Sequence, residues 1–173
     1  MIRAFEGKQP RVDPSCFVSE AAYVVGDVAL GARSSVWPGA VLRADFGPIE
    51  VGQNTHIEDN CTVHHGDEGV HIGDNVTVGH NVVIHCRRIG DNTLIGNGAV
   101  LLDGAEIGSG CVVAAGAVVR PGTVVPDGSF VAGVPGQVRP LPDELKEHTG
   151  RWNSGYADLA QRYLAAGLGD RLD

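Results

Sequence analysis

Three histidines, His64, His80 and His85, recur at a spacing that could build a metal centre. Histidine is the commonest metal ligand in proteins, and three imidazoles on Zn²⁺ leave a fourth tetrahedral position open to water. Zinc lowers the pKa of such a water to about 7, so hydroxide forms at neutral pH. Closed structural zinc sites more often use four ligands including thiolates, and Cys86 beside His85 keeps that alternative open. The chemistry therefore depends on the elements that position these side chains.

Those elements are short, because aliphatic residues recur at every sixth position along most of the chain. The pattern covers twenty positions, with three extra residues before Val51, three more before Ile72, and one fewer before Ile89. A small residue commonly follows each aliphatic one four positions later. A period of six predicts a parallel β-helix, in which each hexad gives a short strand and a corner. Three hexads close one triangular coil, so we expect an all-β solenoid of about seven coils.

Winding the chain into coils converts sequence spacing into geometry. Residues three hexads apart lie on one face in adjacent coils, at the ~4.8 Å spacing of paired strands. His64 and His85 then stack above Arg43, whereas His80 lies one side of the triangle earlier, in a column with Asp59. A three-histidine site is therefore simplest if a second subunit supplies His80. A threefold trimer would build three identical sites at its interfaces.

The hexad pattern stops near residue 138. Pro142, Asp143 and Glu144 are typical of a helix start, and apolar residues from Leu145 to Leu164, among them Trp152, follow at helical spacing. A solenoid exposes an unpaired strand edge at its end, which proteins cover or cap. We therefore expect a β-helix domain over residues 1–138 and a helical appendage over 139–173 that packs on it.

The composition limits the classes of binding partner that the chain is expected to have. A net charge of −8 argues against nucleic acid and anionic membranes. No stretch reaches the ~20 apolar residues of a membrane-spanning helix, and the N-terminus lacks a signal-peptide core. Cys16, Cys61 and Cys111 occupy the small corner position and are expected to be buried, and Cys86 is expected to be structural or to support a neighbouring ligand. This usage favours a cytoplasmic protein.

Motifs along essentially the whole chain resemble the γ-class carbonic anhydrase family. The resemblance is carried by SVWPGAVLRAD at 35–45, IEDN running into VH at 57–64, VTVGHNVVIH at 76–85, IGNGA at 95–99 and AGVP at 132–135. It implies a left-handed β-helix, a homotrimer and bound Zn²⁺, with Fe²⁺ or Co²⁺ as alternatives. It also implies reversible hydration of carbon dioxide to bicarbonate through a metal-bound hydroxide.

Carried over by position, the resemblance implies that His64, His80 and His85 bind the metal, with His80 coming from a neighbouring subunit. Arg43 and Asp45 match an arginine and an aspartate that pair across the subunit interface in that family.

The remaining implied residues surround this centre. Asp59 matches an aspartate beside the metal, and Tyr156 aligns with a tyrosine of the C-terminal helix, although it could equally be a packing aromatic. Glu58 stands where the family usually has glutamine. A glutamine amide can donate a hydrogen bond, whereas an ionised carboxylate only accepts one, so Glu58 could act as a base or lose the role.

Proton transfer is the weakest part of the resemblance. The family's best-known catalysts have a glutamate where this chain has Phe46, and a long acidic loop where it has only residues 65–71. His65 or Glu68 could substitute as a relay. The other histidines, His56, His71 and His148, share no column with a second histidine and are expected to be surface or hydrogen-bonded residues.

Two other functions compete with this prediction. The first is acyl transfer from acyl-coenzyme A, because many hexapeptide proteins are acyltransferases. The second is a weakly active or non-catalytic assembly protein that keeps the metal at its interface. Metal removal distinguishes the second from an enzyme, since an interface staple loses the trimer whereas an enzyme loses turnover first.

Overall fold

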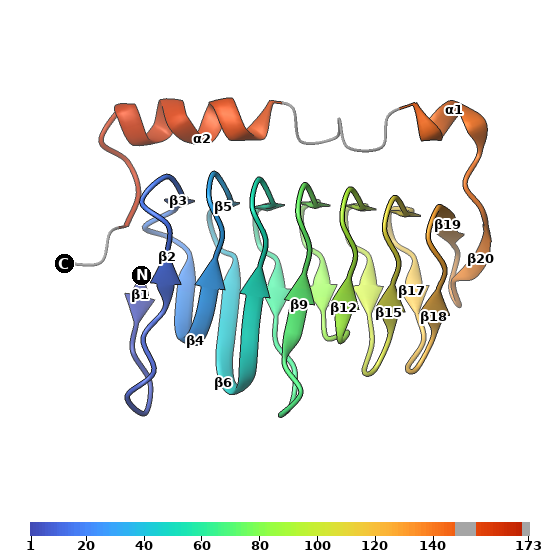
Figure 1. The fold of residues 1–173 in the computed structure, drawn as a ribbon, viewed down its shortest axis with the longest axis horizontal. Coiled ribbons are helices and arrows are strands. Elements are labelled where there is room, and N and C mark those ends of the chain that lie inside the picture. Colours follow the sequence, from blue (N-terminus) through green and yellow to red (C-terminus); the bar gives the residue numbers. More distant parts are fainter. Residues whose placement is uncertain (148–154, 171–173) are drawn as a thin grey trace.

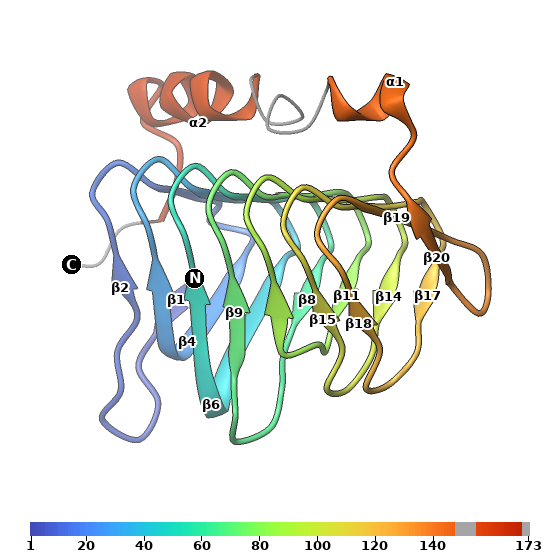
Figure 2. The same cartoon turned by 45° about the vertical axis from the view of Figure 1, so that its right-hand side comes forward.

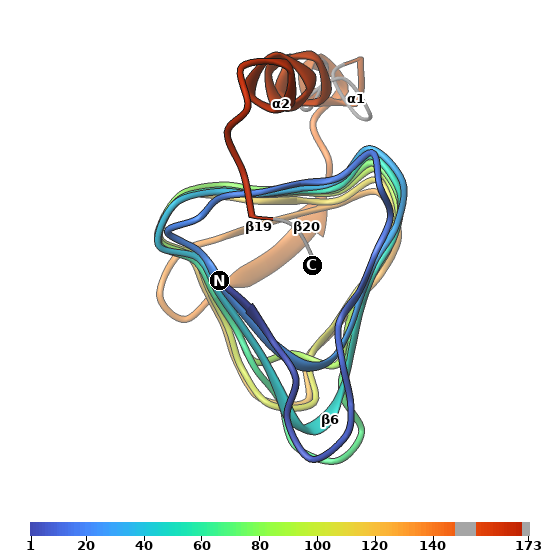
Figure 3. The same cartoon turned by 90° about the vertical axis from the view of Figure 1, so that its left-hand side faces the viewer.

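The computed structural model describes residues 1–147 and 155–170. In these ranges the chain forms a triangular prism of short strands, with a helical segment lying along one side (Figure 1). Viewed along its axis, the coils superimpose as nested triangles (Figure 3). Successive coils wind in the left-handed sense, and the predicted left-handed parallel β-helix of about seven coils is confirmed (Figures 1 and 3).

Each side of the prism is a stack of parallel strands. The first face consists of β1 (Ile2–Arg3), the beginnings of β4 (Tyr23–Leu30) and β6 (Val41–Val51), β8 (Thr62–Val63), β11 (Val83–Ile84), β14 (Val100–Leu101) and β17 (Val118–Val119). The second face consists of β2 (Arg11–Val12), the ends of β4 and β6, β9 (Val70–Ile72), β12 (Arg88–Ile89), β15 (Glu106–Ile107) and β18 (Val124–Val125).

The third face consists of β3 (Phe17–Val18), β5 (Ser35–Val36), β7 (His56–Ile57), β10 (Thr77–Val78), β13 (Leu94–Ile95), β16 (Val112–Val113) and β19 (Ser129–Ala132). β20 (Gln137–Pro140) then pairs antiparallel with β19 and ends this sheet. It lies across the expected domain boundary at residue 138, and the division into 1–138 and 139–173 stays a prediction.

The hexad period exists because every sixth residue fills the prism. The stacked columns Leu42–Val63–Ile84–Leu101 and Ile57–Val78–Ile95 are almost completely buried. Small residues at the corners, such as Cys61 and Ala99, are also buried. Stacking aliphatic side chains in this way removes them from water in every coil, which stabilises the solenoid. The ladder of backbone hydrogen bonds then fixes the register of every outward-facing side chain.

Asparagine and glycine residues turn the corner between the third and first faces. Asn60 and Asn81 adopt left-handed backbone conformations, with φ of 60° and 58°, which asparagine tolerates better than most residues. The Asn81 N–H donates to the Asp59 carbonyl and the Gly98 N–H to the His80 carbonyl, each one coil away. His80 therefore lies at this edge of the prism, directly stacked on Asp59 as its column predicted.

Within the described residues, two helices lie along the outside of the third face (Figures 1 and 2). They are α1 (Asp143–Lys146) and α2 (Tyr156–Ala165). α2 covers Phe17 and Trp37 of the third face with Ala160 and the apolar side of the helix, so the expected helical appendage is confirmed. His148 and Trp152 fall outside the described residues. No helix within the described ranges is both long and apolar enough to cross a membrane.

Candidate metal centre

The ladder of the first face stacks two predicted metal ligands. Val63 pairs with Ile84, so the residues that follow them, His64 and His85, stack one above the other. The His64 N–H donates to the Ile84 carbonyl at 3.0 Å, and the His85 N–H donates to the Leu101 carbonyl at 2.9 Å. Both side chains are partly exposed on the outside of the prism. The predicted stacking of the two histidines is confirmed.

The imidazoles turn one nitrogen toward each other and the other toward a carboxylate. His64 Nδ1 lies 3.3 Å from His85 Nε2. On the far side, His64 Nε2 lies 3.0 Å from Asp45 Oδ1, and His85 Nδ1 lies 2.9 Å from Asp103 Oδ1. The contact between His64 Nε2 and Asp45 is a hydrogen bond, and because an ionised carboxylate cannot donate, it favours the tautomer with hydrogen on that nitrogen. His64 Nδ1 is then free to present a lone pair, and His85 Nε2 presents one in the tautomer with hydrogen on Nδ1.

This arrangement fits a tetrahedral metal ion. With Zn–N bonds of roughly 2.05 Å, two ligands of one tetrahedral zinc lie about 3.3 Å apart, and the facing nitrogens have that separation. Metal-binding histidines commonly hold their second nitrogen against a carboxylate, as His64 and His85 do here. The two facing nitrogens therefore have the separation and the neighbouring carboxylates that a tetrahedral metal ion requires of two of its ligands.

Asp45 is also held by Arg43. The guanidinium donates to Asp45 Oδ2 while His64 contacts Oδ1. Burial alone would raise the pKa of Asp45, but the hydrogen bonds from Arg43 and His64 outweigh it and hold the pKa below its usual value. The carboxylate therefore stays ionised at neutral pH. Within one chain, Arg43 and Asp45 pair with each other.

His80 lies apart from this pair. Its Nδ1 is 3.1 Å from Asp59 Oδ2 and its Nε2 is 2.9 Å from Glu58 Oε2. Its backbone N–H donates to the side chain of Asn97 at 3.0 Å. Among the described residues, the metal-type clusters of histidine, cysteine and carboxylate do not include His80. A single chain therefore does not bring His80 to His64 and His85, which agrees with the separate columns.

Glu58 and Tyr156 form a contact between the third face and α2. Glu58 is 4% exposed, and burial raises the pKa of its carboxyl group even though a hydrogen bond from Tyr156 and the charge of His80 lower it. Burial, with the charge of Glu58, raises the pKa of the Tyr156 phenol to about 12. Tyr156 is thus both a packing aromatic, edge-on to Trp37 at 5.6 Å, and a hydrogen-bond donor beside Glu58.

The two candidate proton relays, His65 and Glu68, lie in different places. The His65 ring lies 5.3 Å from the His85 ring, close to the predicted ligands. Glu68 Oε2 lies 3.5 Å from Arg87 Nε, so the Glu68 carboxylate is paired with Arg87, away from the two histidines. Phe46 is 63% exposed and packs edge-on against His64 at 5.9 Å. It presents an apolar ring beside the histidines.

The cysteines are structural in this fold. All four are free and buried. Burial raises the pKa of the Cys86 thiol to about 12, so it stays protonated at neutral pH, although a thiolate is the form that binds metal. Cys86 points into the core beside Ile84 and Ile89, which makes the four-ligand alternative with His85-Cys86 a poor fit.

Two features were missed by sequence reasoning. Asp103 follows Leu101 by two positions, and the register alone could have placed its carboxylate diagonally beside His85. His56 is fully buried beneath α2 and lies 2.8 Å from the Ser35 hydroxyl, which also accepts a hydrogen bond from Trp37. Its expected hydrogen bond exists, but its complete burial by the helix was not foreseen from a strand position.

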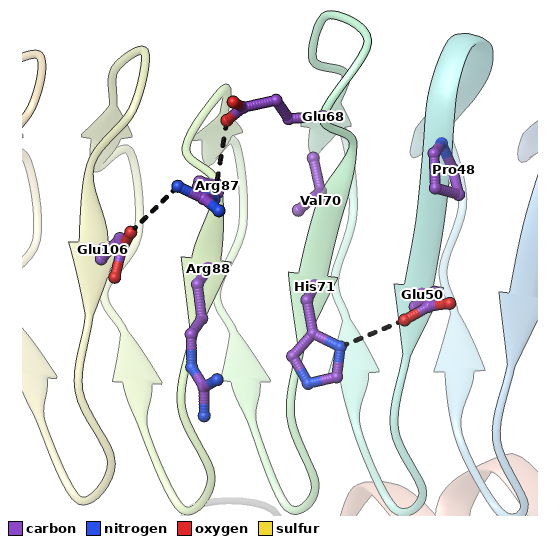
Figure 4. A pocket seen from close by; sticks show the side chains of 8 residues that line it. All are labelled: Pro48, Glu50, Glu68, Val70, His71, Arg87, Arg88 and Glu106. Atoms are coloured by element: carbon purple, nitrogen blue, oxygen red, sulfur yellow. Dashed lines mark hydrogen bonds and ion pairs between the residues drawn. The ribbon is translucent and has the colours of Figure 1, made fainter.

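A surface hollow lies elsewhere, on the second face (Figure 4). It has a volume of about 310 Å³ and is lined by Pro48, Glu50, Glu68, Val70, His71, Arg87, Arg88 and Glu106. Figure 4 shows Arg87 reaching between Glu68 and Glu106, and His71 beside Glu50. Its charges are largely paired within the hollow, and of the predicted site residues only Glu68 takes part.

Comparison with known proteins identifies the repeats. The profile "Bacterial transferase hexapeptide (six repeats)" matches residues 88–121, and "Hexapeptide repeat of succinyl-transferase" matches residues 48–86. The chain is 43% identical over 166 residues to mitochondrial gamma carbonic anhydrase 1 of Arabidopsis thaliana, covering 91% of this chain and 60% of the plant protein. The chain belongs to the γ-carbonic-anhydrase-like family of hexapeptide-repeat proteins.

Two further proteins are similar to this chain, one in sequence and one in fold. A carbonic anhydrase of Geobacillus kaustophilus is 35% identical over 95 residues, covering 54% of this chain and 52% of the relative. The crystal structure of a hexapeptide transferase family protein from Anaplasma phagocytophilum superimposes with a TM-score of 0.89 at 35% identity. It covers 94% of this chain and 98% of that one. The chain spans little more than half the length of the two carbonic anhydrases.

Proposed function

We propose that this chain is a metal-dependent γ-carbonic-anhydrase-like enzyme that hydrates carbon dioxide reversibly to bicarbonate. The proposed assembly is a homotrimer, in which His64 and His85 of one subunit and His80 of a second copy hold Zn²⁺, with Fe²⁺ or Co²⁺ as alternatives. The observation that carries the proposal is the pair of facing nitrogens of His64 and His85, 3.3 Å apart and each backed by an aspartate.

The same pattern extends to His80. Asp59 lies on its Nδ1 in the way that Asp45 and Asp103 lie on the far nitrogens of the other two histidines. Each of the three proposed ligands therefore has one ring nitrogen within 3.1 Å of an aspartate oxygen, and a carboxylate in this place commonly orients a metal-binding histidine. In the single chain Glu58 contacts that other nitrogen of His80. In the assembly we expect Glu58 to yield this nitrogen to the metal and remain beside it.

A bound zinc ion supplies Lewis acidity, lowering the pKa of a water molecule to about 7. The surrounding residues then have separate tasks. Phe46 provides an apolar ring beside His64, where carbon dioxide could rest. Glu58, whose pKa is raised by burial, is suited to accept the proton that hydration releases, because a general base works best with a pKa near the working pH. The Tyr156 hydroxyl orients the Glu58 carboxylate.

Proton export is expected to be slow. Glu68 pairs with Arg87 on another face, so we assign any relay near the metal to His65, beside His85. A modest rate would follow from this short path. Arg43, bound to Asp45, is proposed to act at the subunit interface rather than on bicarbonate.

A second candidate is acyl transfer, which the likeness to the hexapeptide transferase family protein favours. The third is a trimer in which the metal only holds subunits together. Stopped-flow carbon dioxide hydration by zinc-loaded protein separates them from the leading proposal. Incubation with acetyl-coenzyme A and amine or alcohol acceptors tests acyl transfer directly. Size-exclusion chromatography after metal removal tests whether the metal holds the subunits together.

The decisive variant is His80→Ala, with His71→Ala as the matched control, since His71 is an exposed histidine on the second face. Hydration that disappears in His80→Ala and persists in His71→Ala supports an interfacial metal enzyme. Equal turnover in both variants contradicts the proposal. If the wild type is inactive despite one metal per subunit, Glu58→Gln is the next protein to assay, because it restores the amide that the family usually has.

A further inference from the structure

Beside the His64–His85 contact lies a second group of donor atoms, all from one chain. His65, His85 and Asp103 each offer one ligand atom, and these three atoms lie within 4.8 Å of one another. The rings of His65 and His85 are 5.3 Å apart and inclined by 36°. Throughout residues 1–147 and 155–170, no other trio of histidine, cysteine or carboxylate side chains brings its ligand atoms this close together.

The nitrogens of this group lack partners. Both ring nitrogens of His65 are buried without a hydrogen bond, and so is His85 Nδ1, because Asp103 approaches it closely but not along a hydrogen-bond direction. Buried polar atoms without partners are uncommon in native proteins, and a bound water or ion often satisfies them. Asp103 is 68% exposed, so solvent and ions can reach the group from its side.

We propose that His65, His85 and Asp103 form a second cation position, which a single subunit completes without a partner. Its ligand class is a divalent transition metal such as Zn²⁺ or Co²⁺, because two imidazoles and one carboxylate are donors that these ions accept. Three ligands leave room for water on the exposed side of Asp103. Asp103 lies at Nδ1 of His85, whereas His64 lies at its Nε2.

His85 belongs to both sets, so the two positions exclude one another. A neutral imidazole has one N–H and one lone pair. With its lone pair on Nε2, His85 serves the set that contains His64. With its lone pair on Nδ1, it serves the set with His65 and Asp103, and its Nε2–H can donate to His64 Nδ1 across the 3.3 Å contact. The proton moves between the two ring nitrogens, and none is gained or lost.

This exclusion gives the single-chain position a use. A subunit that has not met a second copy lacks the third histidine of the interfacial set, but it has all of His65, His85 and Asp103. It can therefore hold an ion there and release it to the interfacial set when subunits assemble. That use rests on the proposed function, whereas the cation position itself does not.

The test is a titration of metal-free, full-length protein with Co²⁺ alone, followed by visible absorption and by metal analysis of the purified protein. We expect His80→Ala to keep one Co²⁺ per chain, with weaker affinity than the wild type. Adding His65→Ala in that background should weaken binding at least tenfold, as should adding Asp103→Asn. Adding His71→Ala, far from the group on the second face, should leave it unchanged. Asp103→Asn alters only an exposed side chain, so it remains informative if His65→Ala impairs folding.

Two results would overturn the proposal. One is the loss of all Co²⁺ binding in His80→Ala alone. The other is an unchanged affinity when either His65→Ala or Asp103→Asn is added to it. The proposed function fails by a separate result, namely carbon dioxide hydration that is absent from the zinc-loaded wild type or insensitive to His80→Ala. Each idea can therefore fail while the other stands.

Discussion

The prism carries histidines in two regions, His64 and His85 on the first face and His80 at the edge of the third. The same strand stacking positions both regions, but the groups that contact the imidazole nitrogens differ. On the first face, His64 and His85 direct one nitrogen at each other, and only their far nitrogens contact carboxylates. At the edge of the third face, His80 has a carboxylate on both nitrogens, Asp59 and Glu58. The first region presents two facing ligands, whereas the second is occupied by its own chain.

The difference shows that residue type and spacing do not by themselves make a ligand. All three histidines follow a buried aliphatic residue by one or two positions, just after strands of the same length. What separates them is the column in which each is stacked: His85 above His64 in one, and His80 above Asp59 in the other. In the proposed site, the first region offers its nitrogens to an ion directly, whereas the ion must displace Glu58 from His80 Nε2 in the second.

The largest expected effect comes from removing one of the two facing nitrogens. His64→Ala should weaken the tightest Zn²⁺ binding by about a thousandfold, since one of three ligands carries roughly a third of a binding free energy of ~12 kcal/mol. Competition with a chromophoric chelator measures the change. The same assay on His71→Ala, where an exposed histidine on the second face is lost, should give the wild-type affinity. Equal affinities for His64→Ala and wild type would mean that the first region is not half of the metal site.

The sequence predicted the architecture well because one physical rule repeats along it. Each aliphatic residue of the hexad, from Val18 to Val131, must enter the prism, and backbone pairing then fixes the coil. The stacking of His64 on His85 followed directly from this rule. The long-range contacts did not, because nothing in the period tells which way Glu68 turns after a corner loop, or that Arg87 attracts it. The burial of His56 likewise depends on where a distant helix docks.

A smaller effect is expected from removing the aspartate beside a histidine, and it tests whether this aspartate supports metal binding in both regions. Asp45→Asn should weaken metal binding by roughly 10–100-fold, because it removes the carboxylate that orients the far nitrogen of His64. Asp59→Asn should do the same through His80 if the pattern extends to the third face. Zn²⁺ affinity of both variants is compared with that of Asp67→Asn, in which a loop acid away from these contacts is lost. An effect of Asp45→Asn without one of Asp59→Asn would confine the design to the first face.

The covering helix gives the third face a pH dependence of its own. Burial lowers the pKa of His56 to about 4, against about 6.5 in an unfolded chain. Between these two pKa values, His56 is protonated in the unfolded chain but neutral in the folded one. Its contribution to stability is therefore fully present above pH 6.5 and is lost as the pH falls toward 4. From pH 7 to 5 the wild type should lose about 2 kcal/mol more than His56→Asn.

Urea unfolding at the two pH values measures this difference. His71→Ala supplies the control, because it removes an exposed histidine of the second face rather than a buried one, and this variant should follow the wild type. Identical pH slopes for His56→Asn and wild type would show that the helix does not seal the third face as tightly as its packing indicates.

The smallest expected effect concerns the hydroxyl that links the helix to Glu58. Tyr156→Phe keeps the aromatic packing on Trp37 and His56 and removes only the hydrogen bond, so it should cost about 1 kcal/mol of unfolding free energy. Because that hydrogen bond lowers the pKa of Glu58, its loss should raise this pKa further, which carboxyl-selective NMR can follow. Tyr23→Phe, an exposed tyrosine on the first face, should change neither quantity. If the pKa of Glu58 does not change in Tyr156→Phe, Tyr156 is only a packing residue, and burial rather than this hydrogen bond determines the pKa of the Glu58 carboxyl group.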